Sequence, residues 1–413
     1  MRIVAFKPGH DGHIAHITDG TLRLVIEAEK DSGFRYAAVD GTLFAESLQL
    51  IDTSPDVFAL SGWATGANPN GRSIGAGYFG VNAVEHRRTS MFGVPLQHFS
   101  SSHERSHVLC AYALSPFPQG TPCYALTWEG YIGSFYEVDA NVKVRKLGDI
   151  MLGPGVRYAA AYAIADPTFA LPPGGIRLGD AGKLMALAAY ENNIIATQQE
   201  RALLSKLLSS PLKPPDFCKD EFSEFDLFDS GTESTTSKRM ARLISDTIFA
   251  YFKNKISPMV NERRPLLVSG GCGLNCEWNR EWLDTGLFSD VFVPPCTNDT
   301  GAAIGTGADA QFHVTGNAKL RWDVYCGLPF TDDIGADRHA RLGSFVRVSN
   351  DLHCCQTSEQ GSNLGLDFRQ IRVGAKSTRQ QIDSGGTFPP GHTCTSERHK
   401  ATRTVSADSA AVP

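Results

Sequence analysis

Two histidines in the segment SSHERSH, His103 and His107, have the spacing of a metal-binding pair. Apolar residues follow them at helical intervals, and Ser101 or Ser102 can cap the start of such a helix. Residues four positions apart lie on one face of a helix, so both imidazoles can bind the same ion. The alternative interpretation is a pair of surface histidines beside charged neighbours.

A carboxylate from another segment would complete a ligand set of two histidines and one acidic residue. Such a set holds iron(II) or a related divalent ion. Asp299 in CTNDTG is the leading candidate, because it precedes Thr-Gly at the start of a predicted helix. Glu129 in WEGYIG is the second candidate. The sequence therefore predicts a metal centre of His103, His107 and a carboxylate, with Asp299 as the first candidate and Glu129 as the second.

A glycine-rich turn is a candidate for binding phosphate. Gly270, Gly271 and Gly273 follow a predicted strand and precede a helix, so backbone N–H groups can approach phosphate oxygens at the helix N-terminus. The alternative is a tight turn without a ligand. A second glycine-containing turn, at 301–307, directly follows Asp299, which would place a metal ligand and a phosphate cradle in one cleft.

Charged residues elsewhere are candidates for substrate contacts. His10, in the PGHDG turn after the first strand, suits a general base, with a turn histidine as the alternative. Lys30, beside Asp31 and Arg35, offers charge to an anionic substrate or phosphate, although such runs also form solvated surfaces. Lys183 in AGKLMALAAY is predicted to contact a nucleotide or only to lie near a helix end.

The elements that position these residues show an internal repeat. RIVAF, HIAHIT and LRLVIEA predict a strand meander, and the same arrangement recurs at CYALTW, GSFYEVD and VKVRKLGDI. Helices are predicted at 181–190 and 237–256, and two strand–loop–helix units follow. The Pro- and Ser-interrupted stretch at about 200–236 predicts an insertion with short helices. Two similar meanders indicate a duplicated α/β fold.

Composition excludes several classes of protein. The chain has 413 residues, 42% hydrophobic and 20% charged residues and a net charge of -5, so neither a nucleic-acid-binding surface nor a membrane span is indicated. The N-terminus lacks the pattern of a secretion signal, so we expect a cytoplasmic protein with reduced cysteines. Cys272 and Cys276 are not spaced as CxxC, which disfavours a zinc ribbon.

Six segments occur in an order that resembles the NodU/CmcH family of O-carbamoyltransferases. They are PGHDG, SSHERSH, WEGYIGSFYEVD, AGKLMALAAY, SGGCGLNCEWN and VPPCTNDTGAAIG. The resemblance covers residues 1–330. FKPGHDG, EAEKDS, SSHERSH and WEG are most similar to the 3-hydroxymethylcephem carbamoyltransferases of cephamycin pathways.

The resemblance implies an actin-like ATPase fold of two RNase H-like halves. It also implies a division of labour, in which a C-terminal YrdC-like domain joins carbamoyl phosphate and ATP (with Mg) into carbamoyl adenylate. The actin-like domain, residues 1–330, then transfers the carbamoyl group to a hydroxymethyl group of a small acceptor. Assembly of the chain into a homodimer is a further possibility.

The resemblance also assigns roles to individual residues. His103, His107 and Asp299 match the family's metal ligands, with Fe(II) as the expected ion, whereas Glu129 stands where most members carry Asp. His10 matches the residue expected to act as the base.

Further site positions follow from the same resemblance. Asp11 and Lys30 match positions near the base. Asn298, with the Gly270–Gly271 turn, falls where the phosphates of the nucleotide are held, and Lys183 is kept as a nucleotide contact.

The last part of the chain departs from the family pattern. Residues 331–413 have few strong apolar residues and no sustained period, which is typical of a disordered segment. A GxRxxGxRS-like signature, expected to bind carbamoyl phosphate and ATP, is not found after CGLPF. We therefore expect a truncated or disordered remnant of a YrdC-like domain.

The predicted function is ATP-dependent O-carbamoyl transfer to a small natural product, with a 3-hydroxymethylcephem as the expected acceptor. Two alternatives stay open. One is a sugar-kinase-like phosphotransferase, which the paired histidines disfavour. The other is a non-catalytic remnant that binds metal and nucleotide, which the atypical tail suggests.

Overall fold

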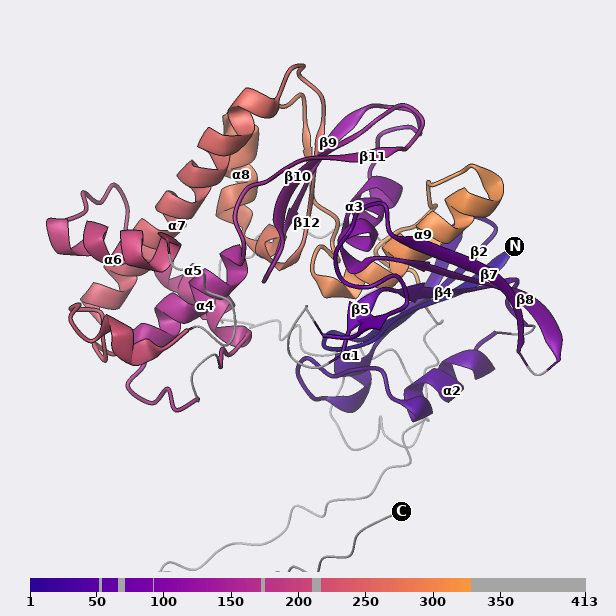
Figure 1. Cartoon of the computed structure of the whole chain (residues 1–413), viewed down its shortest axis with the longest axis horizontal. Helices are drawn as coiled ribbons and strands as arrows, with labels where there is room; N and C mark the ends of the chain where they lie inside the picture. Colours follow the sequence, from indigo (N-terminus) through magenta and orange to yellow (C-terminus); the bar gives the residue numbers. More distant parts are fainter. Residues whose placement is uncertain (52–53, 66–70, 92, 172–174, 210–216, 328–413) are drawn as a thin grey trace, which may run out of the picture. The chain divides into compact units, whose positions relative to one another are not determined.

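The computed structural model describes residues 1–327, except residues 52–53, 66–70, 92, 172–174 and 210–216 (Figure 1). The remnant predicted at 331–413 lies outside the described residues. In the described part of the chain, no helix is long and apolar enough to cross a membrane.

The first sheet has six strands in the order β3-β2-β1-β4-β8-β7. They are β1 (Arg2–Lys7), β2 (His13–Thr18), β3 (Thr21–Glu27), β4 (Val57–Ser61), β7 (Val84–Met91) and β8 (Val94–Ser101). The first three strands form the predicted antiparallel meander, and β4 and β8 continue the sheet in parallel. Asp19 and Gly20 have φ values of 48° and 74°, as a tight Asp-Gly hairpin turn requires.

The second sheet has five strands in the order β11-β10-β9-β12-β13. They are β9 (Cys123–Trp128), β10 (Gly133–Val138), β11 (Val144–Asp149), β12 (Leu266–Ser269) and β13 (Val291–Phe292). Again an antiparallel meander is followed by parallel strands. The predicted duplication is therefore confirmed, and the chain has the actin-like fold of two similar α/β halves.

Two helices connect these halves. Helix α9 (Ala302–Thr315) packs on β1 and β4, whereas α3 (His103–Leu114) packs on β9 and β12, and the two helices contact each other. Their crossing is close, since a Cβ atom on Gly305 would lie 1.9 Å from the backbone oxygen of Ser106. Glycine at this position allows the helices to approach, and the approach brings the first turns of both helices together.

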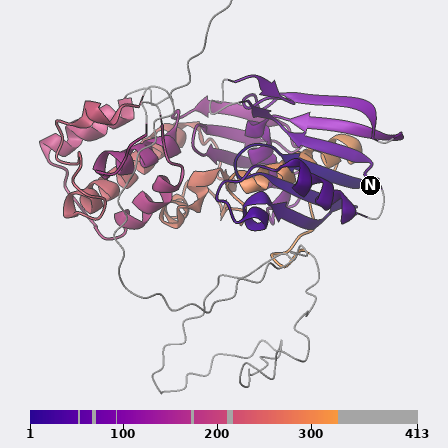
Figure 2. The same cartoon turned by 90° about the horizontal axis from the view of Figure 1, so that it is seen from below.

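The remaining helices and short elements surround the sheets. Helices α4 to α8 form one group in both views (Figures 1 and 2). These helices are α4 (Pro154–Ala165), α5 (Gly179–Ala188), α6 (Gln198–Ser209), α7 (Thr235–Ile256) and α8 (Cys276–Asp284). The other short elements are α1 (Ala28–Ser32), α2 (Gly41–Gln49), β5 (Trp63–Ala64), β6 (Ser73–Ile74) and 3-10 turns at Lys219–Phe222, Ser257–Met259, Gly271–Leu274 and Asp299–Gly301.

The helices predicted at 181–190 and 237–256 are confirmed as α5 and α7. In the stretch at 200–236, the described residues contain most of α6, one short 3-10 turn and the first two residues of α7, in agreement with the predicted short helices.

The largest apolar core lies between the second sheet and helices α4 to α8. Trp128, at the end of β9, stacks on Trp278 with ring centroids 4.4 Å apart, and both side chains are buried. Burying a large apolar side chain stabilises a fold by about 1.5–3 kcal/mol. This packing fixes the end of β9, and therefore the position of Glu129, the next residue.

Candidate metal centre

His103 and His107 lie in the first turns of α3. The Ser102 side chain accepts a hydrogen bond from the backbone N–H of Arg105 at 3.1 Å, which confirms Ser102 as the cap. Both histidine side chains are completely buried. The alternative of two surface histidines is therefore wrong.

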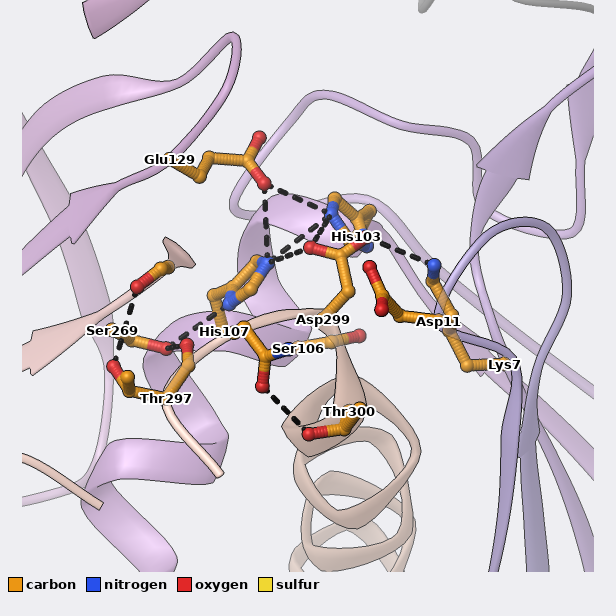
Figure 3. Close-up of polar contacts among 12 residues, drawn as sticks. Lys7, Asp11, His103, Ser106, His107, Glu129, Ser269, Thr297, Asp299 and Thr300 are labelled. Atoms are coloured by element: carbon orange, nitrogen blue, oxygen red, sulfur yellow. Dashed lines mark hydrogen bonds and ion pairs between the residues drawn. The ribbon is translucent and has the colours of Figure 1, made fainter. Parts of the chain in front are cut away.

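Glu129 and Asp299 approach the same two imidazoles from other segments (Figure 3). His103 Nε2 lies 3.3 Å from Glu129 Oε2 and 3.6 Å from Asp299 Oδ1. His107 Nε2 lies 3.4 Å from each of these two oxygens. The two Nε2 atoms are 3.1 Å apart. All four residues are at least nine-tenths buried.

These distances fit a divalent metal ion. With metal–ligand bonds of ~2.1 Å, neighbouring ligand atoms are ~3.0 Å apart in an octahedron and ~3.4 Å apart in a tetrahedron. Four of the five separations, 3.1 to 3.4 Å, fall within these limits, and the fifth, 3.6 Å between His103 Nε2 and Asp299 Oδ1, is slightly longer. Two imidazoles and two carboxylates suit iron(II), manganese or zinc better than magnesium or calcium.

Further hydrogen bonds hold the candidate ligands in orientation. His107 Nδ1 lies 3.0 Å from Ser269 Oγ, at the end of β12. Tyr78 donates its hydroxyl to Glu129 Oε1 at 2.7 Å. A contact at Nδ1 leaves Nε2 as the nitrogen that binds an ion, and such contacts commonly support metal sites.

The charges of the cluster depend strongly on one another. Burial alone would lower the pKa of His107, but the carboxylates of Asp299 and Glu129 raise it to about 9. Burial would raise the pKa of Glu129, yet His103 and His107 bring it down to about 2. A cation is thus favoured at this point, and a proton on His107 Nε2 competes with a metal ion for the same nitrogen.

His10 and Asp11 lie next to this cluster, in the turn between β1 and β2. Nδ1 of His10 is 3.0 Å from Asp11 Oδ2 and 3.7 Å from Asp299 Oδ2, and 38% of its side chain is exposed. Asp11 has a φ of 50°, a conformation that Asp tolerates better than most residues. The structure therefore brings these two predicted residues together with Asp299.

His13 attaches this turn to helix α9. Its Nε2 accepts the backbone N–H of Ala303 at 2.9 Å, and its Nδ1 lies 3.1 Å from the backbone oxygen of Asp11. Burial is the main reason that its pKa falls to about 3, so the ring is neutral and can accept this bond. His13 was not predicted as a site residue, and its spacing from His10 gives no clear signal of this role.

Lys7, Trp63 and Tyr78 are further residues that the sequence patterns did not identify. The Lys7 ammonium lies 2.9 Å from Asp299 Oδ2 and 3.9 Å from the centroid of the Trp63 ring. The ring of Trp63 contacts His103, with centroids 4.8 Å apart. One available signal was that side chains alternate along β1, which places Lys7 on the same face as the apolar Ile3 and Ala5.

The glycine-rich turn lies beside the cluster, but packing explains two of its glycines. Gly270 has a φ of 100°, and a Cβ atom there would lie 2.5 Å from the backbone oxygen of Trp128. A Cβ atom on Gly273 would lie 2.4 Å from Thr297 Oγ1, whereas one on Gly271 would meet nothing within 4 Å. Phosphate binding by this turn stays a prediction.

Asn298 helps to form the turn that begins α9. Its side-chain oxygen accepts the Thr300 hydroxyl at 2.7 Å, and its backbone oxygen accepts the N–H of Gly301 at 3.0 Å. These bonds fix the backbone directly before Asp299.

Lys30 and Lys183 are not part of the four-residue cluster. Lys30 lies 3.1 Å from Glu29 and 4.0 Å from Glu27, and Lys183 lies 3.0 Å from Asp180. More than half of each lysine side chain is exposed. No contact in the described part of the chain joins either lysine to the candidate metal ligands, so their substrate roles stay predictions.

Comparison with known proteins identifies relatives of this chain. Residues 225–308 match the family described as carbamoyltransferase N-terminus. The chain is 40% identical over 338 residues to 3'-hydroxymethylcephem-O-carbamoyltransferase from Amycolatopsis lactamdurans, covering 82% of this chain and 65% of that protein. It is 41% identical over 339 residues to the protein of the same name from Streptomyces clavuligerus, covering 82% and 64%.

A more distant relative is nodulation protein U from Rhizobium tropici, which is 31% identical over 374 residues, covering 79% of this chain and 64% of that protein. The chain thus spans slightly less than two thirds of the length of each of these three relatives.

Solved structures show weaker similarity. The activator of 2-hydroxyisocaproyl-CoA dehydratase from Clostridium difficile has a TM-score of 0.41 and 10% identity, covering 76% of this chain and 98% of that chain. Component A of (R)-2-hydroxyglutaryl-CoA dehydratase from Acidaminococcus fermentans has a TM-score of 0.41 and 12% identity, covering 74% and 96%. The duplicated sheet order, rather than these similarities, establishes the fold.

Proposed function

Since this chain belongs to the carbamoyltransferase family, we propose that its described residues carry the acceptor step of an ATP-dependent O-carbamoyl transfer. The proposed acceptor is the hydroxymethyl group of a small natural product, with a 3-hydroxymethylcephem as the leading candidate. The observation that carries the proposal is the buried cluster of two histidines and two carboxylates beside His10, in a chain 40% identical to a cephem carbamoyltransferase.

His10 is the proposed general base. Its Nδ1 contacts the Asp11 carboxylate at 3.0 Å, which leaves Nε2 as the basic nitrogen. The ring is partly exposed, so an acceptor hydroxyl can reach it. Asp11 would stabilise the imidazolium formed when His10 takes the hydroxyl proton.

The transfer is an acyl exchange, in which the carbamoyl group moves from the phosphate of AMP to the acceptor oxygen. The acceptor oxygen attacks the carbamoyl carbon of carbamoyl adenylate, and the bond between that carbon and the phosphate oxygen breaks. AMP leaves, and the hydroxyl proton is held on His10. Positioning the alcohol beside its base supplies much of the rate enhancement in such a reaction.

His103, His107, Glu129 and Asp299 are the residues that would hold a divalent metal ion, with iron(II) as the leading candidate. When bound, such an ion supplies Lewis acidity toward an oxygen of the carbamoyl donor. We assign the backbone N–H groups near Gly271, with Asn298, to the phosphate of the nucleotide. Carbamoyl adenylate would be formed from carbamoyl phosphate and ATP by a YrdC-like domain.

The test is a product assay with the full chain, a divalent metal and a 3-hydroxymethylcephem. Carbamoyl phosphate and ATP are supplied in one reaction, and carbamoyl adenylate in another. A carbamoylated cephem together with AMP supports the proposal. Formation of ADP and a phosphorylated acceptor would instead identify a sugar-kinase-like enzyme. If the metal-loaded chain yields neither product in either reaction, the non-catalytic alternative holds.

A further inference from the structure

Lys7, the last residue of β1, is a fully buried lysine beside the candidate metal centre. Its ammonium group lies 2.9 Å from Asp299 Oδ2 and 3.9 Å from the centroid of the Trp63 ring, and it donates a hydrogen bond to the backbone oxygen of His10. A buried charge is costly unless it is paired. The Lys7 side chain therefore belongs to the electrostatics of the site, not to the solvated surface.

The two carboxylate oxygens of Asp299 face different groups. Oδ1 lies 3.6 Å from His103 Nε2 and 3.4 Å from His107 Nε2. Oδ2 lies 2.9 Å from Lys7 Nζ and 3.7 Å from His10 Nδ1. In Figure 3 the Asp299 carboxylate accordingly lies between the two histidines and Lys7.

Asp299 belongs to a second set of donor atoms as well. Ligand atoms of His10, Asp11 and Asp299 lie within 4.8 Å of one another. A carboxylate shared by two donor sets is the arrangement seen in two-metal sites, where the ions are ≈ 3.5–4 Å apart. By donor chemistry alone, this region would accept two cations.

We infer that the Lys7 ammonium serves as the second cation of this region and thereby restricts the centre to one metal ion. This inference rests on the metal site proposed above. A second divalent ion in the His10–Asp11–Asp299 set would lie close to the ammonium group, which is completely buried. Like charges repel strongly where water is excluded, so the lysine and a second ion would compete for Asp299 Oδ2.

The experiment is a titration of the full, metal-depleted chain with Mn²⁺. Bound ions are counted, and electron paramagnetic resonance is used to distinguish an isolated Mn²⁺ from a magnetically coupled pair. The wild-type chain is compared with Lys7→Ser and Lys7→Ala, two small replacements that remove the charge and vacate its position. Lys7→Arg retains a cation, and the double variant Lys7→Ser with Asp11→Asn replaces the charged donor of Asp11 by a neutral, weaker one. Circular dichroism identifies the variants that fold.

One isolated ion per wild-type chain and a coupled pair in Lys7→Ser or Lys7→Ala support the inference. Lys7→Arg should again bind one ion, because it retains the charge. One ion in the double variant would place the second ion of the Ser and Ala variants at Asp11. Two ions in the wild-type chain overturn the inference, even if no variant folds. One ion or none in the folded Lys7→Ser and Lys7→Ala chains also overturns it, while one ion in the wild type leaves the proposed metal site intact. A wild-type chain that binds no Mn²⁺ contradicts both.

Discussion

Ser269→Ala tests whether the contact behind His107 supports metal binding. The change removes the hydroxyl that lies 3.0 Å from His107 Nδ1. Ser269 is 2% exposed, so bulk water cannot readily replace its oxygen. The His107 imidazole stays in the chain, but no contact at Nδ1 then fixes its tautomer and its orientation toward a bound ion.

The size of the effect follows from this loss of orientation. Removing a hydrogen bond to a metal-binding histidine typically weakens metal affinity by about 10–100-fold. That range corresponds to about 1.4–2.7 kcal/mol of binding free energy. The N–H group left unpaired in the interior would also lower the free energy of unfolding by about 1–3 kcal/mol. Binding should therefore weaken without disappearing.

Calorimetric titration of the metal-depleted chain with Mn²⁺ measures the change. Ser134→Ala is a matched control, because Ser134 is 3% exposed in β10 and donates to Asp149 at 2.6 Å, outside the four-residue cluster. We expect the Kd to rise in Ser269→Ala and to stay at the wild-type value in Ser134→Ala. If both variants bind Mn²⁺ with the same Kd, the contact to His107 does not support an ion and the reasoning is refuted.

Three more changes give distinct outcomes. His103→Ala should weaken Mn²⁺ binding by more than ~100-fold, beyond the loss of an orienting contact, and unchanged metal content would contradict the site. The pKa of His13 falls from 6.5 to about 3 on folding, so the free energy of unfolding decreases as pH falls below 6.5. When the pH is lowered from about 6.5 to 5, urea titrations should show that the free energy of unfolding falls by about 2 kcal/mol less in His13→Gln than in the wild type. An equal decrease in both proteins would argue against a neutral His13. Gly305→Ala places a Cβ atom 1.9 Å from the backbone oxygen of Ser106 and should lower the free energy of unfolding by at least about 1–3 kcal/mol. The control Gly182→Ala adds a Cβ atom that meets nothing within 4 Å and should stabilise α5 by about 0.5–1 kcal/mol. Melting curves that rank the two variants in the opposite order would refute this packing argument.

Much of the fold could be predicted because its signals are local. The two meanders follow from short apolar runs joined by turns such as Asp19–Gly20, and α7 follows from its helical spacing. The parallel pairing of β4 with β1 and β8 carries no comparable signal. That pairing depends on burial by helices distant in sequence, so local patterns could not specify it.

The candidate site was predictable where spacing or a motif marks it. The interval between His103 and His107 places both on one helical face. Asp299 was marked by its position before a predicted helix, and the family resemblance matched it to a metal ligand. Glu129 was only the second candidate, because most members of the family carry Asp at its position. Lys7 was missed because a lysine at a strand end is usually exposed, and only the distant Asp299 makes its burial favourable. Lys30 was chosen for its charge, but charge alone does not show whether a side chain faces the site or the solvent.

Helix α9 gives the domain a particular order of assembly during synthesis. Ile304 and Ala308 of this helix complete the apolar cluster beneath Ile3 and Ala5, which belong to β1, far earlier in the chain. The inner face of the first sheet therefore lacks its covering until the ribosome has passed α9, and contacts this distant along the chain form slowly. Asp299, just ahead of α9, joins the two histidines in the same late step. An ion bound at the proposed metal centre would find its complete set of ligands only after α9 has been made. Such an ion could reinforce the finished domain but could not nucleate its folding.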